Sequence, residues 1–403
     1  MELVFGMKDF YPREVQLKRR IEQQLRSLFE SWGYEEVEPP TIEYYATLEK
    51  TLGEDLRERT FKFINRNGEL VCLRPEFTTS VARMLSSRSK EACPRFRVYY
   101  DGKIFRYPSS SFRTESELTQ IGLENIGSNR PQDDAEVVAL ALFSLERAGI
   151  ADFEVDVGHA GFFKVLVKKL GLSPLEENLV KQLLKKRDFV ALRDIIGERS
   201  FSGFSLREFF VELPFWRGRW ELLKKAEARF GEEKEILAIL ERIKEVLTIL
   251  EDYGLAERVF LNLGVIRDFD YYTGIVFEGF SPRVGHPLLA GGRYDELFPI
   301  FGKKAPACGF ALFVERLMEV IEESSFTSRA SHLVFEVCFS SRVRKAIFGV
   351  AERLREQGIS LVLQEWPEKH CRVSWQDQSV EFPESAIAEL EEFIKREFGT
   401  WKS

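Results

Sequence analysis

The sequence predicts an α+β protein that has a helical insert and a small C-terminal α/β domain. Before residue 173, apolar residues recur both at the alternating spacing of strands and at the spacing of helices. Residues 173–256 are rich in Leu, Lys and Glu and carry an apolar repeat of helical period. After the polar, small-residue stretch 323–332, strand and helix patterns alternate again. We therefore expect one domain at 1–322, with the helical insert at about 173–256, and a second at 330–403.

The composition is that of a globular chain with an acidic balance. Of its 403 residues, 44% are hydrophobic and 31% are charged, and the formal net charge is −7, which gives no global attraction to nucleic acid. No apolar run approaches the ~18 residues of a membrane span, and the first residues lack the apolar region of a signal peptide. We expect a cytoplasmic protein with reduced cysteines and no metal site, because its five cysteines and four histidines show no ligand spacing.

The first elements expected are a helix and a short strand. Pro12 suits the first turn of a helix and Gly33 suits its end, so a helix is expected between them. The apolar residues between these two positions recur at helical spacing: Ile21, Leu25, Leu28, Phe29 and Trp32. A strand at 34–37 and the pair Pro39-Pro40 follow.

A hairpin, two strands and a helix come next. Residues 61–73 contain two apolar stretches around Asn67-Gly68, a residue pair typical of hairpin turns. Strands are expected at 98–105 and 120–126, and a helix is expected at 133–148, where apolar residues share one face.

The later elements follow from the same patterns. In the helical insert the apolar residues predict a packing face: Ile236, Leu240, Ile243, Leu247 and Leu250. The strand pattern resumes at Val259. In the second domain we expect a strand, a helix, two strands and a helix, in that order: 334–339, 341–357, 359–365, 371–375 and about 384–397.

The segment from Phe105 to Glu124 resembles motif 2 of histidyl-tRNA synthetase, a class II aminoacyl-tRNA synthetase. The ends of the motif are kept, with Arg106 at its start and Gln120 and Glu124 at its close. The middle differs, because Pro108 stands where the family has a glutamate and a serine run replaces a loop rich in Arg, Gln and Gly. The kept ends are the parts that hold histidine in the family, and the altered middle is the part that handles ATP and tRNA.

Four other segments resemble the same family. Residues 73–78 are similar to its LRPE segment, with Phe77 in place of a glycine, and residues 267–274 are similar to its RGLDYY segment. Residues 290–295 look like its glycine-rich loop. Residues 306–317 look like motif 3, which keeps Arg316 on a helix but has Phe313 where a glycine lies against the adenosine. The segment 133–138 matches the start of a family helix.

This resemblance implies a fold and a histidine pocket. The fold is a class II synthetase-like core, a mostly antiparallel sheet flanked by helices, with a dimer interface at motif 1, the helix, strand and proline of residues 12–40. Histidine offers an ammonium, a carboxylate and two ring nitrogens, which need carboxylates, an arginine and hydroxyl groups. The implied binding residues are Glu76, Thr78, Arg106, Gln120, Glu124, Arg267, Tyr271 and Tyr272. The alternatives are a solvent-facing Glu76 and Glu124 and ordinary core tyrosines.

A histidine pocket beside an altered ATP site is the pattern of the ATP phosphoribosyltransferase regulatory subunits, relatives of histidyl-tRNA synthetase. Membership of that family implies a non-catalytic chain that activates the short-form catalytic subunit in a hetero-oligomer, expected to be a hetero-octamer. It also implies that L-histidine binds for feedback inhibition of the first step of histidine biosynthesis, with no cofactor and no tRNA. The alternatives are an active histidyl-tRNA synthetase, since Arg106, Arg267 and Arg316 persist, or another amino-acid-activating relative.

Overall fold

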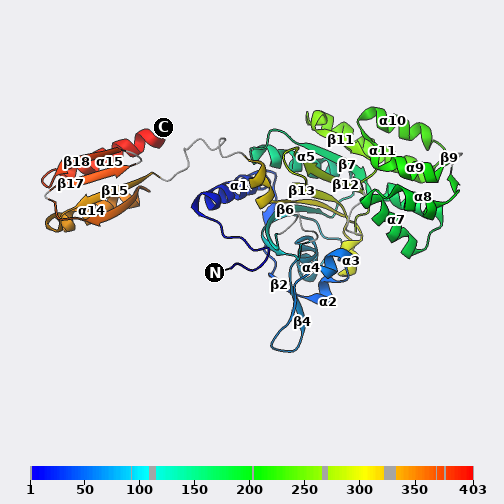
Figure 1. Cartoon of the computed structure of the whole chain (residues 1–403), viewed down its shortest axis with the longest axis horizontal. Helices are drawn as coiled ribbons and strands as arrows, with labels where there is room; N and C mark the ends of the chain where they lie inside the picture. Colours follow the sequence, from blue (N-terminus) through cyan, green and yellow to red (C-terminus); the bar gives the residue numbers. More distant parts are fainter. Residues whose placement is uncertain are drawn as a thin grey trace. The chain divides into compact units, whose positions relative to one another are not determined.

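The computed structural model has two compact units, Met1–Glu322 and Glu323–Ser403 (Figure 1). It describes every residue except 1, 92, 109–114, 202–203, 266–270, 322–332, 369, 376–377 and 403. The stretch 323–332, which we expected to be a linker, and most of the altered motif 2 loop therefore lie outside the described residues. Within the described part of the chain, no helix is long and apolar enough to cross a membrane.

A large sheet organises the first unit. Its nine described strands, in spatial order, are β1 (Glu35–Glu36), β5 (Phe96–Phe105), β6 (Glu117–Ile126), β14 (Ala307–Phe313), β13 (Leu289–Arg293), β12 (Ile275–Phe280), β7 (Glu154–His159), β11 (Val259–Asn262) and β10 (Arg217–Gly218). The pairs β1–β5 and β7–β11 are parallel, and the other neighbours are antiparallel. The predicted class II synthetase-like core with a mostly antiparallel sheet is confirmed.

The two faces of this sheet carry different residues because side chains alternate along each strand. On β6, Ile121 and Leu123 point into the main hydrophobic core together with α1 (Pro12–Ser31) and α5 (Pro131–Arg147). On the same strand, Gln120 and Glu124 point to the opposite face, where α4 (Thr78–Arg88) and α12 (Leu297–Ile300) pack. Figure 1 shows α1 and α5 on one side of the sheet and α4 on the other. The second face is the one that carries the site.

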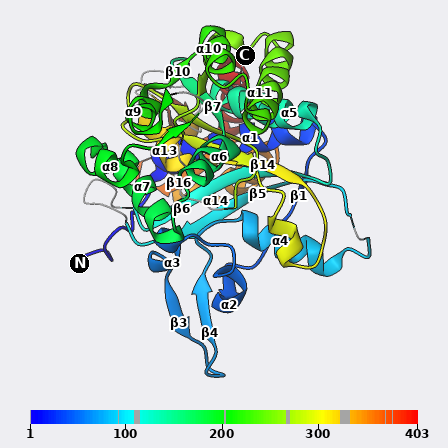
Figure 2. The same ribbon diagram turned by 90° about the vertical axis from the view of Figure 1, so that its right-hand side faces the viewer.

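The predicted hairpin is confirmed and belongs to a smaller sheet. Strands β3 (Lys62–Ile64) and β4 (Leu70–Leu73) pair antiparallel, and β2 (Ile42–Tyr44) adds on the other side of β4. The turn contains Gly68 with a φ of 78°, a left-handed value that glycine adopts without strain. This hairpin projects from the unit in Figure 2. Two short helices, α2 (Tyr45–Leu48) and α3 (Glu54–Glu58), connect β2 to β3 along the chain.

The glycine-rich segment at 290–295 is not the loop that the sequence suggested. Residues 289–293 form β13, which lies in the sheet between β12 and β14. Glycine is needed there because the sheet leaves no room for side chains. A Cβ on Gly291 would lie 2.5 Å from the Gly309 carbonyl oxygen and from the Phe277 ring, and one on Gly292 would lie 2.8 Å from the Tyr272 ring.

The region predicted as a helical insert is mostly helical. After α6 (Ala160–Leu170) it contains α7 (Pro174–Lys186), α8 (Phe189–Ile196), α9 (Leu206–Glu212), α10 (Trp220–Arg229) and α11 (Lys234–Asp252). It also contains the two-residue strands β8 (Ser200–Phe201) and β9 (Phe204–Ser205), and it supplies β10 to the edge of the large sheet. Two-residue strands are too short to show an alternating pattern, which is why the sequence analysis missed them.

The second unit is a small α/β layer. Its strand order is β16 (Ser360–Glu365), β15 (Val334–Phe339), β17 (His370–Trp375) and β18 (Gln378–Pro383), and its helices are α14 (Arg344–Glu356) and α15 (Ile387–Lys402). The edge strand β18 was not expected from the sequence, because Val380 and Phe382 are its only large apolar residues and most of the strand is exposed. The other five elements agree with the expected positions to within a few residues.

Candidate functional site

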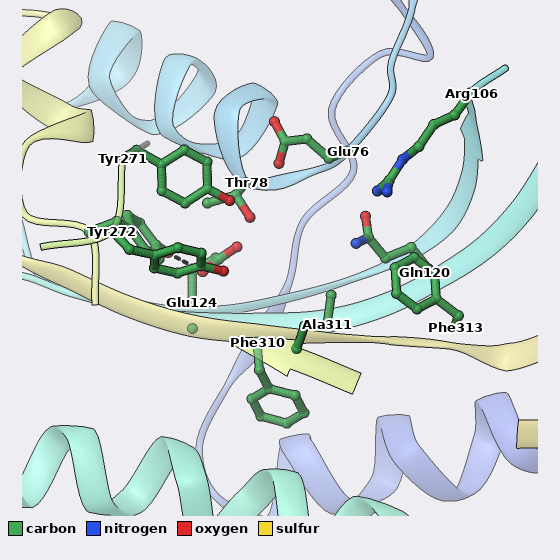
Figure 3. A pocket seen from close by; sticks show the side chains of 13 residues that line it. Glu76, Thr78, Arg106, Gln120, Glu124, Tyr271, Tyr272, Phe310, Ala311 and Phe313 are labelled. Carbon is green, nitrogen blue, oxygen red and sulfur yellow. Dashed lines mark hydrogen bonds between the residues drawn. The ribbon is translucent and has the colours of Figure 1, made fainter. Parts of the chain in front are cut away.

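A pocket opens on the α4 face of the large sheet and encloses about 440 Å³ of space, open solvent included. Its lining residues are Glu76, Thr78, Arg106, Gln120, Glu124, Tyr271, Tyr272, Ala290, Tyr294, Gly309, Phe310, Ala311 and Phe313. Seven of the eight residues predicted from the sequence are therefore brought together (Figure 3). The eighth, Arg267, lies outside the described residues.

Strands β6 and β14 build the floor of the pocket. They pair with Glu124 opposite Gly309 and Gln120 opposite Phe313, so residues of both strands that point to the α4 face meet there. A Cβ on Gly309 would overlap the Glu124 carboxylate, so only glycine at this position leaves the carboxylate its place. The Phe310 ring points away from the pocket, toward the helices on the other face (Figure 3).

Glu124 is a buried acid in this floor. Its side chain is 1% exposed, and its Oε2 accepts a hydrogen bond from the Tyr294 hydroxyl group. No described residue makes a well-formed hydrogen bond to its Oε1. Burial raises the pKa of Glu124 to about 8, although the hydroxyl groups of Tyr294 and Thr78 act in the opposite direction. Glu124 is therefore not the solvent-facing glutamate of the alternative interpretation.

Glu76 is the second buried acid. It lies just before α4, and its Oε1 accepts a hydrogen bond of 2.9 Å from the backbone N–H of Thr79, at the start of that helix. The other oxygen, Oε2, has no well-formed hydrogen bond from the described part of the chain. Burial raises the pKa of Glu76, and the positive charge of Arg106 partly offsets this effect. The exposed turn that we kept as an alternative for this residue is thus wrong, since Glu76 is 2% exposed.

Arg106 and Gln120 form the other end of the pocket (Figure 3). The Nε of Arg106 donates to the Pro75 carbonyl oxygen at 2.6 Å. Burial lowers the pKa of Arg106 to about 10, and the nearby Arg59 acts in the same direction. The buried Gln120 Oε1 lacks a well-formed hydrogen bond from any described residue. A cation at one end and two acids at the other suit a zwitterionic ligand.

Phe313 lies close to two arginines. Its ring centre lies 5.6 Å from the guanidinium carbon of Arg106 and 4.0 Å from that of Arg316. Arg316 lies on α13 (Val314–Val320), as predicted, and its Nη1 donates to the Pro287 carbonyl oxygen at 2.7 Å. The Phe313 ring therefore lies near both arginines.

Three tyrosines form the aromatic wall of the pocket. The ring centre of Tyr271 lies 4.8 Å from that of Tyr272 and 5.7 Å from that of Tyr294. Tyr271 and Tyr272 precede β12 rather than lying within a strand.

Tyr294, Ala290, Gly309 and Ala311 were not among the binding residues expected from the sequence, although the segment 290–294 was expected to lie over the bound amino acid. The sequence gives two indications of these residues. Small residues alternate along β14, and Tyr294 comes two positions after the glycine pair of β13. Phe77, which replaces a family glycine, does not line the pocket. It stacks on Tyr100 with ring centres 4.4 Å apart.

Comparisons with known proteins agree on one family. The family profile of histidyl-tRNA synthetase matches residues 6–317. An ATP phosphoribosyltransferase regulatory subunit of Acetivibrio thermocellus is 33% identical over 356 residues, which cover 88% of this chain and 85% of that protein. The protein of the same name from Thermoanaerobacter pseudethanolicus is 37% identical over 320 residues, covering 79% and 82% of the two chains.

Solved structures support the same assignment. A Bacillus halodurans protein described as an ATP phosphoribosyltransferase regulatory subunit/histidyl-tRNA synthetase matches with a TM-score of 0.79 and 29% identity, covering 90% of this chain and 92% of that one. A histidyl-tRNA synthetase from Nostoc shares the fold, with a TM-score of 0.75 at 17% identity. The chain belongs to the ATP phosphoribosyltransferase regulatory subunit family, on a histidyl-tRNA synthetase-like fold.

Proposed function

We propose that the pocket binds L-histidine and that the chain carries histidine feedback to a short-form ATP phosphoribosyltransferase catalytic subunit, which it also activates. One observation carries the binding proposal. Three buried acceptor oxygens face the pocket without a well-formed hydrogen bond from a described residue: Glu76 Oε2, Gln120 Oε1 and Glu124 Oε1. Buried acceptors without a partner are costly, so a ligand rich in N–H donors would stabilise this arrangement.

Histidine has the matching groups. In the proposed complex its ammonium donates to Glu76 and Thr78, and its imidazole N–H donates to Glu124 between the tyrosine rings. Its carboxylate lies toward Arg106, with Arg267 as a second arginine by resemblance to the family.

We propose further that the chain has no synthetase activity. Adenylate formation depends on positioning the α-phosphate beside the amino acid carboxylate. The Phe313 ring lies near Arg106 and Arg316, at a position where the family has a glycine, and Pro108 offers no acidic group. The purified chain should therefore give no histidine-dependent exchange of pyrophosphate into ATP, measured against an active histidyl-tRNA synthetase. Robust exchange would make the chain a synthetase.

The proposed assembly is a hetero-oligomer with the catalytic subunit, which the family name implies. Self-association is proposed through the motif 1 elements α1 and β1, and no tRNA is expected to bind residues 330–403, which show no clustered basic face with interleaved aromatics. We also propose a cytoplasmic location, as expected from the sequence.

Calorimetry on the isolated chain tests histidine binding. Wild-type protein should bind L-histidine, and Glu124→Gln should bind it about tenfold more weakly, because the amide keeps an acceptor oxygen but cannot carry the negative charge that strengthens a hydrogen bond from the imidazole. Glu117→Gln is the matched control, because Glu117 lies on the same strand, outside the pocket, in an ion pair with Lys103. Equal affinities for wild type and Glu124→Gln would place the ligand elsewhere.

A further inference from the structure

Behind the pocket, four charged residues from three segments of the chain form a cluster, of which Arg293 and Asp134 are buried and Arg242 and Asp295 are partly exposed. Arg293 ends β13 and is 3% exposed, and Asp134 on α5 is 2% exposed. The Nε of Arg293 donates to Asp134 Oδ1 at 2.8 Å, and its Nη1 donates to Asp295 Oδ1 at 3.0 Å. Arg242, from α11, donates to Asp134 Oδ2 through its Nε at 2.9 Å and its Nη2 at 2.7 Å. These four residues form the Arg293 cluster, in which two cations balance two anions.

Arg293 holds the aromatic wall of the pocket through its backbone and side chain. Its carbonyl oxygen accepts the N–H of Thr273 at 2.8 Å, just after Tyr272. A Cβ on Gly274 would lie 2.8 Å from the Arg293 side chain, so this turn packs directly on the arginine. The next residue along the chain is Tyr294, whose hydroxyl group donates to Glu124. The place of Arg293 therefore sets the place of Tyr272 and Tyr294.

Asp295 also links the cluster to the segments that line the pocket. Its backbone N–H donates to the Thr273 Oγ1 at 3.0 Å, and its Oδ1 accepts the N–H of Ala307 on β14 at 3.1 Å. The cluster thus joins the turn before β12, the end of β13 and the start of β14. All three segments lead into the pocket lining.

Arg242 reaches this cluster from outside the sheet. Helix α11 packs along α5, as Figure 1 shows, and α11 belongs to the helical region between β7 and β11. Without Arg242, Asp134 Oδ2 loses both of the hydrogen bonds described for it. One buried cation would then have to balance two carboxylates, a state that a buried site tolerates poorly. Arg293 would shift toward one carboxylate, and the attached turn and strand end would follow.

We propose that Arg242 is a positioning residue for the pocket, acting through Asp134 and Arg293 on Tyr272 and Tyr294. This inference rests on the proposed histidine binding. Because coupling between two sites is reciprocal, a ligand that fixes Tyr294 and Glu124 also stabilises the contact between α11 and α5. The stability of the contact between α11 and α5 therefore depends on whether the pocket holds a ligand.

The test combines calorimetry with hydrogen exchange on the full chain. Arg242→Ala should weaken L-histidine binding at least about fivefold, the lower end of typical couplings, and Arg242→Lys should recover part of the affinity. Arg217→Ala is the control, because Arg217 is likewise a partly exposed arginine that pairs with carboxylates, Asp156 and Glu154, but lies at the far edge of the same sheet. It should bind histidine as wild type does.

In wild-type protein, L-histidine should slow amide exchange in α11, and Arg242→Ala should abolish this effect. Unchanged affinity in Arg242→Ala, or no histidine-dependent change in α11 of the wild type, would overturn the inference while histidine binding stands. If Arg242→Ala does not fold, the wild-type exchange experiment alone decides between these outcomes. No histidine binding by the wild type would overturn the proposed function and this inference together.

Discussion

The two buried glutamates decide what the pocket can bind. Glu76 and Glu124 each use one oxygen in a described hydrogen bond and leave the other oxygen to the pocket. Keeping two such acids in an empty pocket is unfavourable unless a proton or a cation compensates them. The raised pKa values of both residues are the signature of this situation.

The pH dependence of stability should report on Glu124. Burial raises its pKa in the folded chain from the ordinary value of 4.5 to about 8, so the folded state holds the proton more tightly than the unfolded state. The resulting contribution to stability is full below the unfolded pKa and is lost as pH rises through the folded pKa. We expect urea unfolding of the ligand-free chain to show this loss. Between about pH 5 and pH 8, the unfolding free energy of the wild type should fall by a few kcal/mol relative to that of Glu124→Gln. A wild-type-to-variant difference that is constant over this range would contradict the assignment.

Single site residues could be predicted from the sequence where they belong to a motif. Residues that meet only through the packing of the fold could not. Arg106, Gln120 and Glu124 came from one contiguous segment, and the structure brings them to one pocket. Asp134 and Arg242 are 108 positions apart, and nothing in the local sequence indicates that they meet. Contacts of this kind depend on how whole helices pack.

At the scale of elements, the spacing of β6 and β14 makes the room for the site. Where the two strands pair, Glu124 of β6 lies opposite Gly309 of β14, and the space for the Glu124 side chain exists because Gly309 has none. The sequence shows the alternation along each strand but not which strands are neighbours. For that reason Gly309 and Ala311 could not be assigned to the pocket, and β13 was taken for a loop.

Gly309→Ala tests this spacing. The added methyl group would overlap the Glu124 carboxylate and the Leu123 carbonyl oxygen, so we expect a loss of about 1–3 kcal/mol in unfolding free energy, typical of overpacking, and loss of histidine binding. Gly285→Ala is the control, because a Cβ there meets nothing within 4 Å. Thermal unfolding and calorimetry of both variants provide the comparison, and a Gly309→Ala protein as stable and as histidine-competent as the control would refute the packing account.

At the scale of the whole molecule, the chain keeps the synthetase-like fold and changes the side chains near the ATP position. The fold could be predicted from ordered motifs because each of them fixes a strand or a helix end. The role in a complex could not be derived from the fold, since the related synthetase from Nostoc has the same one. We propose that role from the names of the chain's relatives, and histidine binding from the pocket.

The most direct measurement is histidine inhibition of a reconstituted complex. A wild-type catalytic subunit is combined with this chain, either wild type, Glu124→Gln or the Glu117→Gln control, and ATP phosphoribosyltransferase activity is followed against L-histidine concentration. With Glu124→Gln we predict full activity without histidine and at least about a tenfold loss of histidine sensitivity, within the range of typical couplings. Inhibition at the same histidine concentration with wild type and Glu124→Gln would show that the effector site is not in this pocket, which would contradict the central claim.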